Sequence, residues 1–235
     1  MRNILRKIFS TLFIKPAPQL KRNRRKPIGQ SMIEFAILLP ILIMLFSGMV
    51  EFGFMLNTYM SLLDSTRQSA RLCSNMTPFK LVNNVIVDDT NFSPYCAQAV
   101  VITLDPSLAT PPDPNARLIV MDPTRDDVIV SILRVTVVAN AIDKIDRLPE
   151  GKFFYSLYGN EDSAYSNTDI EDFMTQEDPV THVNSLPVET GILIVEVYYG
   201  YEGILKLPWV AAFMSEADPI MLHASTIMPL VAAKP

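Results

Sequence analysis

One stretch decides the fold: residues 29–56 read GQSMIEFAILLPILIMLFSGMVEFGFML. Its only charged residues are Glu34 and Glu51. About 20 apolar residues, each rising about 1.5 Å along a helix, cross the hydrocarbon core of a bilayer. We therefore predict a transmembrane helix over residues 30–56.

A cleaved signal peptide is the competing interpretation of an apolar run near the N-terminus. The hydrophobic region of a signal peptide spans only about 7–15 residues and ends at a small-residue cleavage site. Here the run is longer, and residues 47–51 (SGMVE) make a poor site, so retention is favoured. Beyond the run, apolar residues continue at three- and four-residue spacing, which predicts an amphipathic helical extension over residues 57–76.

Charge is distributed unevenly about this helix. The predicted leader, residues 1–29, holds nine basic residues and no acidic one, which leaves 11 Lys and Arg against 25 Asp and Glu in the rest of the chain. A basic segment directly before an apolar run is typical of a membrane protein whose N-terminus stays in the cytoplasm. Nucleic-acid binding is the competing interpretation. Because the basic cluster adjoins the apolar run, we expect no nucleic-acid partner.

Residues 77–235 differ from the helix in amino-acid composition, and this composition predicts an extracytoplasmic α+β domain. Runs rich in Val, Ile, Tyr and Thr are separated by Pro- and Asp-rich turns, which predicts a small, mostly antiparallel sheet packed on the helical extension. The polar and acidic residues 143–190 are expected to form an insertion or surface lobe between two strands. The predicted strands are residues 99–104, 127–138, 191–201 and 220–228.

The two cysteines, Cys73 and Cys96, both follow the apolar run. In an oxidising compartment they are expected to form a disulfide. Two separate buried thiols are the alternative.

The junction between leader and apolar run carries a carboxylate in an unusual place. Glu34 lies five residues after Gly29, where a charge inside a helix that enters a bilayer is unfavourable and is normally paired. If a peptidase cuts after Gly29, the new chain begins at Gln30 with an ammonium about one helical turn from a Glu34 carboxylate, its own or a neighbour's. Such pairing would favour side-by-side docking of subunits. The alternative is a Glu34 side chain that extends into the headgroup region.

Four positions further along the run suggest helix contacts. Glu51, near the outer end, is interpreted either as a helix-end charge at the membrane surface or as a contact with a basic group of a neighbouring subunit. Gly48 and Gly53 would allow another helix to approach closely. Pro40 is expected to kink or locally open the helix.

No sequence pattern points to catalysis. The chain has no Gly-rich phosphate loop, no zinc-type Cys/His spacing and no nucleophile elbow, so we predict neither an enzyme, nor a cofactor, nor a metal site. His182 and His223 lie far apart and are expected to be structural. The acidic residues 161–178 do not match an EF-hand loop and are expected to be a solvated surface.

The start of the chain closely resembles the N-terminal pattern of TadE-like proteins. These are pilin-like components of the tight-adherence (Flp pilus) machinery, related to type II secretion and type IV pilus systems. Residues 192–199 and 223–228 are also similar to the late strands of that family. The N-terminal resemblance is carried by Gly29, residues 34–36 (EFA), Pro40, residues 48–53 (GMVEFG) and residues 69–71 (SAR).

This resemblance implies a non-enzymatic minor pilin or pseudopilin that helps to assemble a tight-adherence (Flp-type) pilus or a related secretion filament. It would cross the bacterial inner membrane once, with its C-terminal domain in the periplasm or in the pilus itself. A prepilin peptidase would process it between Gly29 and Gln30. Its partners would be the inner membrane, other pilins or pseudopilins, and the assembly machinery. The expected subunit contacts are Glu34, Phe35, Pro40, Gly48, Glu51 and Gly53.

The alternative is an uncleaved, single-pass membrane-anchored protein that acts as an extracytoplasmic scaffold or binding protein. Among pilins, the length of 235 residues argues against a major Flp pilin, because major pilins are much smaller. It favours a minor or initiating subunit.

Overall fold

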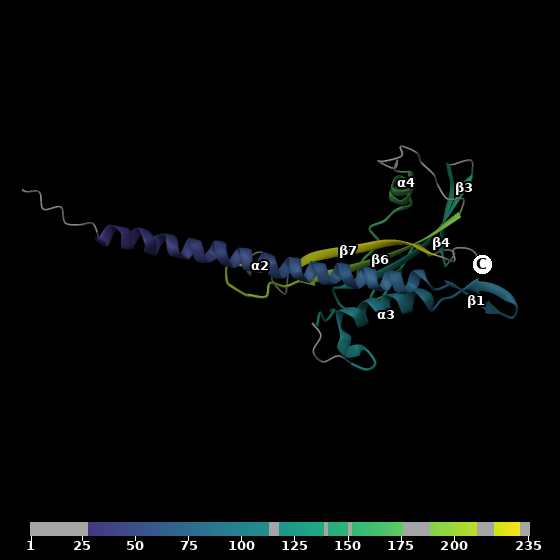
Figure 1. Cartoon of the computed structure of the whole chain (residues 1–235), viewed down its shortest axis with the longest axis horizontal. Helices are drawn as coiled ribbons and strands as arrows, with labels where there is room; N and C mark the ends of the chain where they lie inside the picture. The colour runs from purple at the N-terminus through teal and green to yellow at the C-terminus, as the bar shows by residue number, and fades with distance from the viewer. Residues whose placement is uncertain are drawn as a thin grey trace, which may run out of the picture. The chain divides into compact units, whose positions relative to one another are not determined.

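The computed structural model describes residues 28–112, 118–138, 141–149, 152–175, 189–210 and 219–230. The chain divides into two compact units, residues 1–45 and residues 46–235. Figure 1 labels the elements, which in chain order are α2 (Ile28–Ser74), β1 (Phe79–Val82), β2 (Val85–Asp88), α3 (Phe92–Leu104), a 3₁₀ turn (Pro106–Leu108), β3 (Asp127–Val138), β4 (Ala141–Leu148), β5 (Tyr155–Ser156), α4 (Asn167–Thr175), β6 (Glu189–Tyr201) and β7 (Ile220–Leu230).

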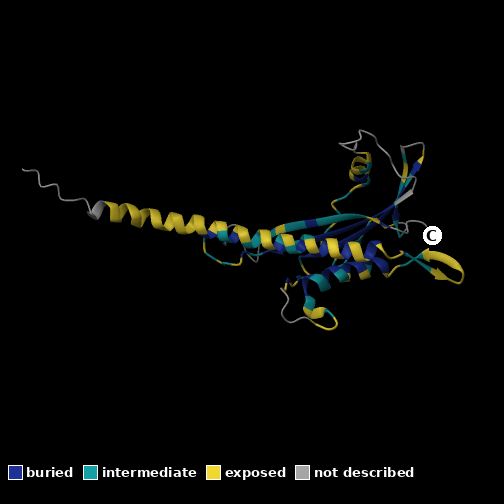
Figure 2. Ribbon diagram, viewed as in Figure 1, coloured by how far each residue is buried: buried dark blue, intermediate teal, exposed yellow. Residues whose placement is uncertain are grey.

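Helix α2 is 47 residues long, and its side chains fall into two stretches of different exposure. Residues 31–46 are all exposed, although nearly all of them are apolar. From residue 47 onward one face of the helix is buried. The buried positions, single or in adjacent pairs, recur about every three, four or seven residues, which Figure 2 shows as alternating blue and yellow stretches. The buried face consists of Ser47, Glu51, Thr58, Leu62, Ser65, Thr66, Ser69, Ala70, Cys73 and Ser74.

A five-stranded antiparallel sheet lies at the centre of the second unit. Its strand order is β4-β3-β6-β7, and the short β5 pairs with the beginning of β3. The two central strands pair along nearly their whole length, from Asp127 opposite Tyr198 to Thr136 opposite Glu189. Val, Ile and Leu dominate both strands, as expected where a strand is covered on both faces.

The two faces of the sheet carry separate hydrophobic clusters. Because successive residues of a strand point to opposite faces, Val128 and Val130 of β3 pack with α2 and α3, whereas Leu133 and Val135 pack on the other face. There they meet Ile170 of α4, and Figure 1 shows α3 and α4 on opposite sides of the sheet. Each buried side chain of this size contributes about 1.5–3 kcal/mol of transfer free energy.

The α+β class is confirmed, and so are three of the four predicted strands. Residues 127–138, 191–201 and 220–228 lie in β3, β6 and β7 respectively.

The fourth predicted strand, residues 99–104, is wrong, because these residues complete helix α3. Their β-branched side chains suggested a strand. However, Cys96, Val100 and Leu104 are all buried and are spaced by four residues, which is the period of a helix face. Burial against the core, and not strand formation, accounts for their composition.

The acidic segment predicted as an insertion, residues 143–190, begins inside strand β4. It continues through β5 and α4, and its residues 176–188 lie outside the described part of the chain. β4 pairs with β3 from Ile132 to Val138, so the first residues of this segment belong to the sheet itself.

Strands β1 and β2 form a separate two-stranded hairpin. The two residues between them, Asn83 and Asn84, have φ values of 53° and 63°. A two-residue turn with positive φ at both positions matches the twist of a hairpin, and Asn tolerates that conformation better than most residues.

Candidate functional site in the long helix

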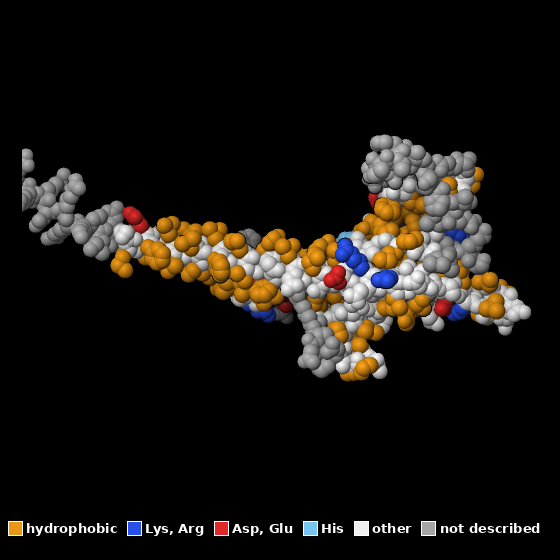
Figure 3. Space-filling view, in the orientation of Figure 1, with side chains coloured by type: hydrophobic (Ala, Val, Ile, Leu, Met, Phe, Trp, Pro, Cys, Tyr) orange, Lys and Arg blue, Asp and Glu red, His pale blue; other side chains and the backbone are white. Residues whose placement is uncertain are grey.

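The first described part of α2 exposes an apolar surface. Ile33, Phe35 and Leu45 each expose more than half of their surface, and Figure 3 shows hydrophobic side chains covering this part of the helix. The helix has a mean hydropathy of 2.3 in its most apolar window. A single membrane span and an N-terminal signal sequence both have this length and composition.

The predicted processing residues lie at the beginning of this helix. Gly29 and Gln30 fall in the first turn of α2. Glu34, Phe35 and Pro40 follow within the exposed stretch, and the helix continues through Pro40. Cleavage after Gly29 and contacts of these side chains with other subunits stay predictions.

The two helix glycines have no packing role inside the described chain. Gly48 and Gly53 are exposed, and a Cβ atom added at either would have no described heavy atom within 4 Å. Glycine is intrinsically unfavourable in a helix interior by about 1 kcal/mol relative to alanine. Contacts within the chain therefore do not require glycine at either position.

Glu51 connects α2 to the segment that follows β6. The residue is only 1% exposed, and both carboxylate oxygens accept hydrogen bonds. The hydroxyl of Tyr201 donates to Oε1 at 2.6 Å, as does the backbone N–H of Ile204, also at 2.6 Å. The backbone N–H of Leu205 donates to Oε2 at 2.9 Å. Hydrogen bonds to both oxygens are what a buried carboxylate requires to offset its lost hydration.

Two neighbours complete the surroundings of this carboxylate. A Cβ atom at Gly203 would lie 3.4 Å from Oε1 of Glu51 and 3.3 Å from Cγ1 of Val210, so glycine permits the close approach of the chain. Burial raises the pKa of the Tyr201 phenol, and its hydrogen bond to Glu51 raises it further. The Tyr201 hydroxyl therefore stays protonated and remains a donor.

The end of β6 is held in place by a second acidic residue, Asp126. The backbone N–H of Gly200 donates to Oδ1 of Asp126 at 2.8 Å, and Nε of Arg125 lies 3.3 Å from the same oxygen. Arg125 also pairs with Glu202 at 2.7 Å. A Cβ atom at Gly200 would lie 2.6 Å from Nε of Arg125, so the guanidinium occupies the space that a side chain would need. These contacts fix the position of Tyr201.

Trp209 forms a second connection to α2, one helical turn before Glu51. Its indole Nε1–H donates to Oγ of Ser47 at 2.8 Å, and Ser47 is buried. Trp209 is the only tryptophan of the chain. We refer to residues 202–210, which contact α2 through these hydrogen bonds, as the 202–210 loop.

Further along the helix, polar side chains meet the sheet directly. The hydroxyls of Thr66 in α2 and Thr226 in β7 are 2.9 Å apart, and Thr66 also donates to the carbonyl of Leu63 at 2.9 Å. Ser65 donates to the carbonyl of Leu62 at 2.7 Å. Small polar residues whose hydroxyls bond to the helix backbone allow α2 and the sheet to pack closely.

The structure gives Glu51 partners that neither expectation named. Its carboxylate is buried against the chain's own loop. A part for Glu51 in a subunit contact stays a prediction, but the carboxylate is not exposed to make it. The sequence indicated that a charge in an apolar helix needs a partner. Two of the three donors are backbone N–H groups, which carry no sequence signal.

Asp127, the first residue of β3, organises the segment of residues 156–161. Its buried carboxylate accepts hydrogen bonds from the Ser156 hydroxyl at 2.6 Å and from the N–H groups of Tyr158, Asn160 and Glu161 at 2.9–3.0 Å. Burial alone would raise the pKa of Asp127, but these hydrogen bonds outweigh it and hold the pKa below the ordinary value. Asp127 is therefore ionised and holds residues 156–161 beside the start of β3.

A further polar cluster surrounds the buried Glu196 of β6. Its carboxylate accepts hydrogen bonds from the Ser163 hydroxyl and from the N–H of Ala164, the latter at 3.0 Å. Nε2 of His223 lies 3.2 Å from the same carboxylate, and the His223 ring stacks on Tyr198 with centroids 4.5 Å apart. His223 thus has structural contacts, whereas His182 lies outside the described residues.

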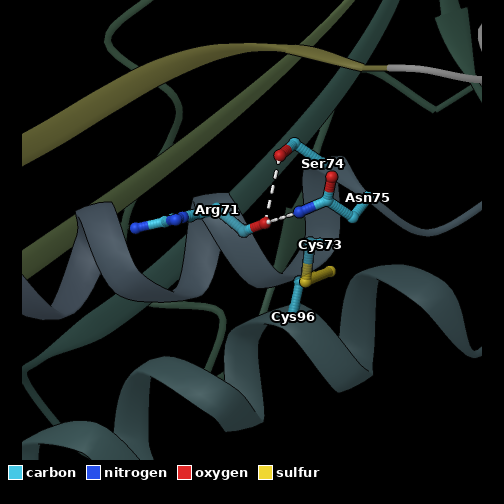
Figure 4. Close-up of a disulfide and its surroundings, with 5 residues drawn as sticks. All are labelled: Arg71, Cys73, Ser74, Asn75 and Cys96. Atoms are coloured by element: carbon cyan, nitrogen blue, oxygen red, sulfur yellow. Dashed lines mark hydrogen bonds between the residues drawn. A yellow bond between two sulfur atoms is a disulfide. The ribbon is translucent and has the colours of Figure 1, made fainter.

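Cys73 and Cys96 form a disulfide between α2 and α3. Figure 4 shows it beside the last turn of α2, where Ser74 and Asn75 both donate to the carbonyl of Arg71, at 3.1 and 2.8 Å. Both cysteines are fully buried. The cross-link joins the end of the long helix to the helix that packs beside it.

Within the described residues, no group of three or more His, Cys, Asp or Glu side chains is arranged to hold a metal ion. The buried carboxylates at Glu51, Asp127 and Glu196 are each hydrogen-bonded by neighbouring donors. In each case these hydrogen bonds join segments that lie far apart in the chain.

Comparison with known proteins gives one match. Residues 29–71, which lie within α2, match a family model described as TadE-like protein. No curated protein and no solved structure matches the chain significantly.

The fold and the family-model match together define the class of this protein. It is an α+β protein with one long N-terminal helix, and the first half of that helix is apolar and exposed. Over residues 29–71 the chain is similar to the TadE-like family. This family suggests a protein of Tad pilus assembly, a generally non-enzymatic group.

Proposed function

We propose that this chain is a minor pilin or pseudopilin that takes part in assembling a tight-adherence (Flp-type) pilus or a related secretion filament. Helix α2 crosses the bacterial inner membrane once, over residues 30–56. The basic leader stays in the cytoplasm and the sheet domain lies outside, in agreement with the positive-inside rule.

One observation carries this proposal: the TadE-like segment coincides with a helix whose two halves are exposed differently. The first half presents apolar side chains all round, which suits lipid or neighbouring helices. The second half buries a partly polar face against its own domain, with Glu51 bonded to the 202–210 loop and Thr66 to strand β7. The helix is thus joined firmly to its domain and keeps an apolar stretch for lateral packing in a filament.

Processing would bring a cationic group close to Glu34 in such packing. Cleavage between Gly29 and Gln30 leaves an ammonium at the new N-terminus, about one helical turn from Glu34. In a bilayer an ammonium and a carboxylate stabilise each other, because either charge alone is unfavourable there. Pairing of the Glu34 carboxylate with the amine of the adjacent subunit would set the stagger between neighbouring helices.

The first test is the mature N-terminus of the protein purified from membranes and from sheared pili. The proposal expects a chain that begins at Gln30, detected by intact mass, and expects this cleavage to be lost when the prepilin peptidase is removed. A functional protein that retains Met1 would instead indicate the uncleaved membrane-anchored scaffold.

The second test separates assembly from membrane insertion. Glu34→Ala should abolish or strongly reduce piliation while the protein remains in the membrane fraction. Asp64→Ala is the matched control, since Asp64 is an exposed carboxylate on the same helix outside the predicted span. Normal piliation in Glu34→Ala would contradict the proposed pairing.

A further inference from the structure

The 202–210 loop has an unusual surface for a loop. Its sequence is EGILKLPWV, in which apolar residues alternate with a single Lys and a single Glu. Ile204 exposes 52% of its surface, and Leu205, Leu207 and Trp209 are half-buried. Lys206 is exposed. Loops that face only water are normally polar, so this composition indicates a less polar environment.

The loop is fixed beside one turn of α2. Glu51 accepts the N–H groups of Ile204 and Leu205, and Ser47 accepts the indole N–H of Trp209. These contacts hold both ends of the apolar sequence against the same stretch of helix. Figure 1 shows the loop beside α2 after the end of β6.

That turn is also where α2 should leave the hydrocarbon core within the proposed span of residues 30–56. The core is about 30 Å thick and takes about 20 helical residues, so a helix that enters the core near Met32 leaves it near Glu51. At this level the exposed side chains of the helix are still apolar. Phe46, Met49 and Phe52 each expose more than half of their surface, as Ile204 of the loop does. The helix and the loop that is bonded to it therefore both expose apolar side chains near Glu51.

We propose that the 202–210 loop is a membrane-contact element that lies in the outer headgroup region of the bilayer that α2 crosses. Trp209 occupies the interface, where indole rings are favoured because one edge is apolar and the N–H is polar. Ile204 and Leu207 reach the upper part of the acyl chains. The ammonium of Lys206 extends to lipid phosphate. This inference rests on the proposed single membrane span.

The proposal also explains why an acidic residue stands at the end of an apolar run. Near the hydrocarbon boundary a carboxylate loses hydration, and the N–H groups of a loop at the same depth lack water partners as well. Glu51 and the loop satisfy each other. The contact would set the depth of the sheet domain, because the loop can enter the interface no further than its bonds to α2 allow.

The single tryptophan makes a direct test possible with the wild-type chain. The full-length protein is placed in nanodiscs whose phosphatidylcholine is brominated either near the carboxyl end or near the methyl end of its acyl chains. Tryptophan emission should be quenched several-fold more strongly by the shallow bromines than by the deep ones. Acrylamide in the water should quench it only weakly.

A matched control moves the probe away from the loop. In a Trp209→Phe/Tyr95→Trp double variant the only tryptophan lies on α3, at a position that is 49% exposed. Its emission should respond to acrylamide and to neither brominated lipid. Circular dichroism of the variant, compared with wild type, shows whether its fold is retained.

The outcomes separate this inference from the function on which it rests. A chain that carbonate extracts from membranes would overturn both the single span and the loop contact. A chain that stays integral, but whose Trp209 is unquenched by either lipid, would overturn the loop contact alone. Quenching only by the deep bromines would also contradict an interfacial position.

Discussion

The phenol of Tyr201 donates a hydrogen bond of 2.6 Å to the carboxylate of Glu51, which lies 150 residues earlier in the chain. Tyr201→Phe removes this hydroxyl and leaves the buried carboxylate with its two backbone donors. Hydrogen bonds to charged groups contribute about 1.5–3 kcal/mol, so the free energy of unfolding should fall by about that amount. Denaturant unfolding of the full chain in detergent, followed by circular dichroism, measures the difference. Tyr95→Phe, on exposed α3 surface, is the control and should be nearly neutral.

Glu51 itself should be more sensitive than its phenol partner. Glu51→Ala leaves the N–H groups of Ile204 and Leu205 without an acceptor, and each unsatisfied buried group costs about 1–3 kcal/mol. The loop should separate from α2, so the emission of Trp209 should shift to longer wavelength. Glu51→Gln should show a smaller shift, because its amide keeps one acceptor oxygen. Unchanged emission in Glu51→Ala would mean that the loop is held by other contacts.

The parts of the fold that the sequence predicted well are those where local pattern and burial agree. Strands β3, β6 and β7 are long runs of Val, Ile and Leu between turns, and they form the centre of the sheet. The apolar character of α2 follows from composition alone. In contrast, residues 99–104 have the composition of a strand but form a helix, because the core on which α3 packs favours the same β-branched residues.

The parts that were missed depend on contacts between distant segments. Strand β4 reads AIDKIDRL, and its residues from 143 onward fall in the segment predicted as a surface lobe. An edge strand with charged residues is, however, a common way to protect an open sheet edge. The Glu51 contact could be anticipated as a need for a partner, but its backbone donors can be identified only once the end of β6 is placed. A sequence signal for the loop does exist in the single tryptophan, Trp209.

The disulfide should contribute to stability through the unfolded state. Cys73 and Cys96 are 23 residues apart, and closing a loop of that length stabilises a protein by about 3 kcal/mol in the chain-entropy model. A Cys73→Ser/Cys96→Ser double variant should therefore unfold at lower denaturant concentration than the wild type. Adding reductant should lower the stability of the wild type and leave the variant unchanged. Equal stability of the two proteins under oxidising conditions would contradict this role.

Asp127 should make the domain sensitive to acid. Its pKa is lowered in the folded state by hydrogen bonds that outweigh the effect of burial, so folding favours the ionised form. The stabilisation is fully present above the ordinary Asp pKa of 3.8 and is lost as the pH falls through the lower folded-state pKa. Asp127→Asn should reduce stability at neutral pH by about 1–3 kcal/mol and flatten its decline below pH 3.8. Acid titration of both proteins, followed by circular dichroism, measures the two slopes.

Gly53 allows the stability of the helix to be separated from its assembly. A Cβ atom at this position meets no described heavy atom, so Gly53→Ala should leave the fold intact and favour the helix by about 1 kcal/mol. If a neighbouring helix approaches closely at Gly53 in the filament, the added methyl group should nevertheless reduce piliation. Asn57→Ala, one turn further along and also exposed, is the control and should leave piliation unchanged. Piliation by Gly53→Ala at the wild-type level, with the expected gain in stability, would show that no helix packs against this position.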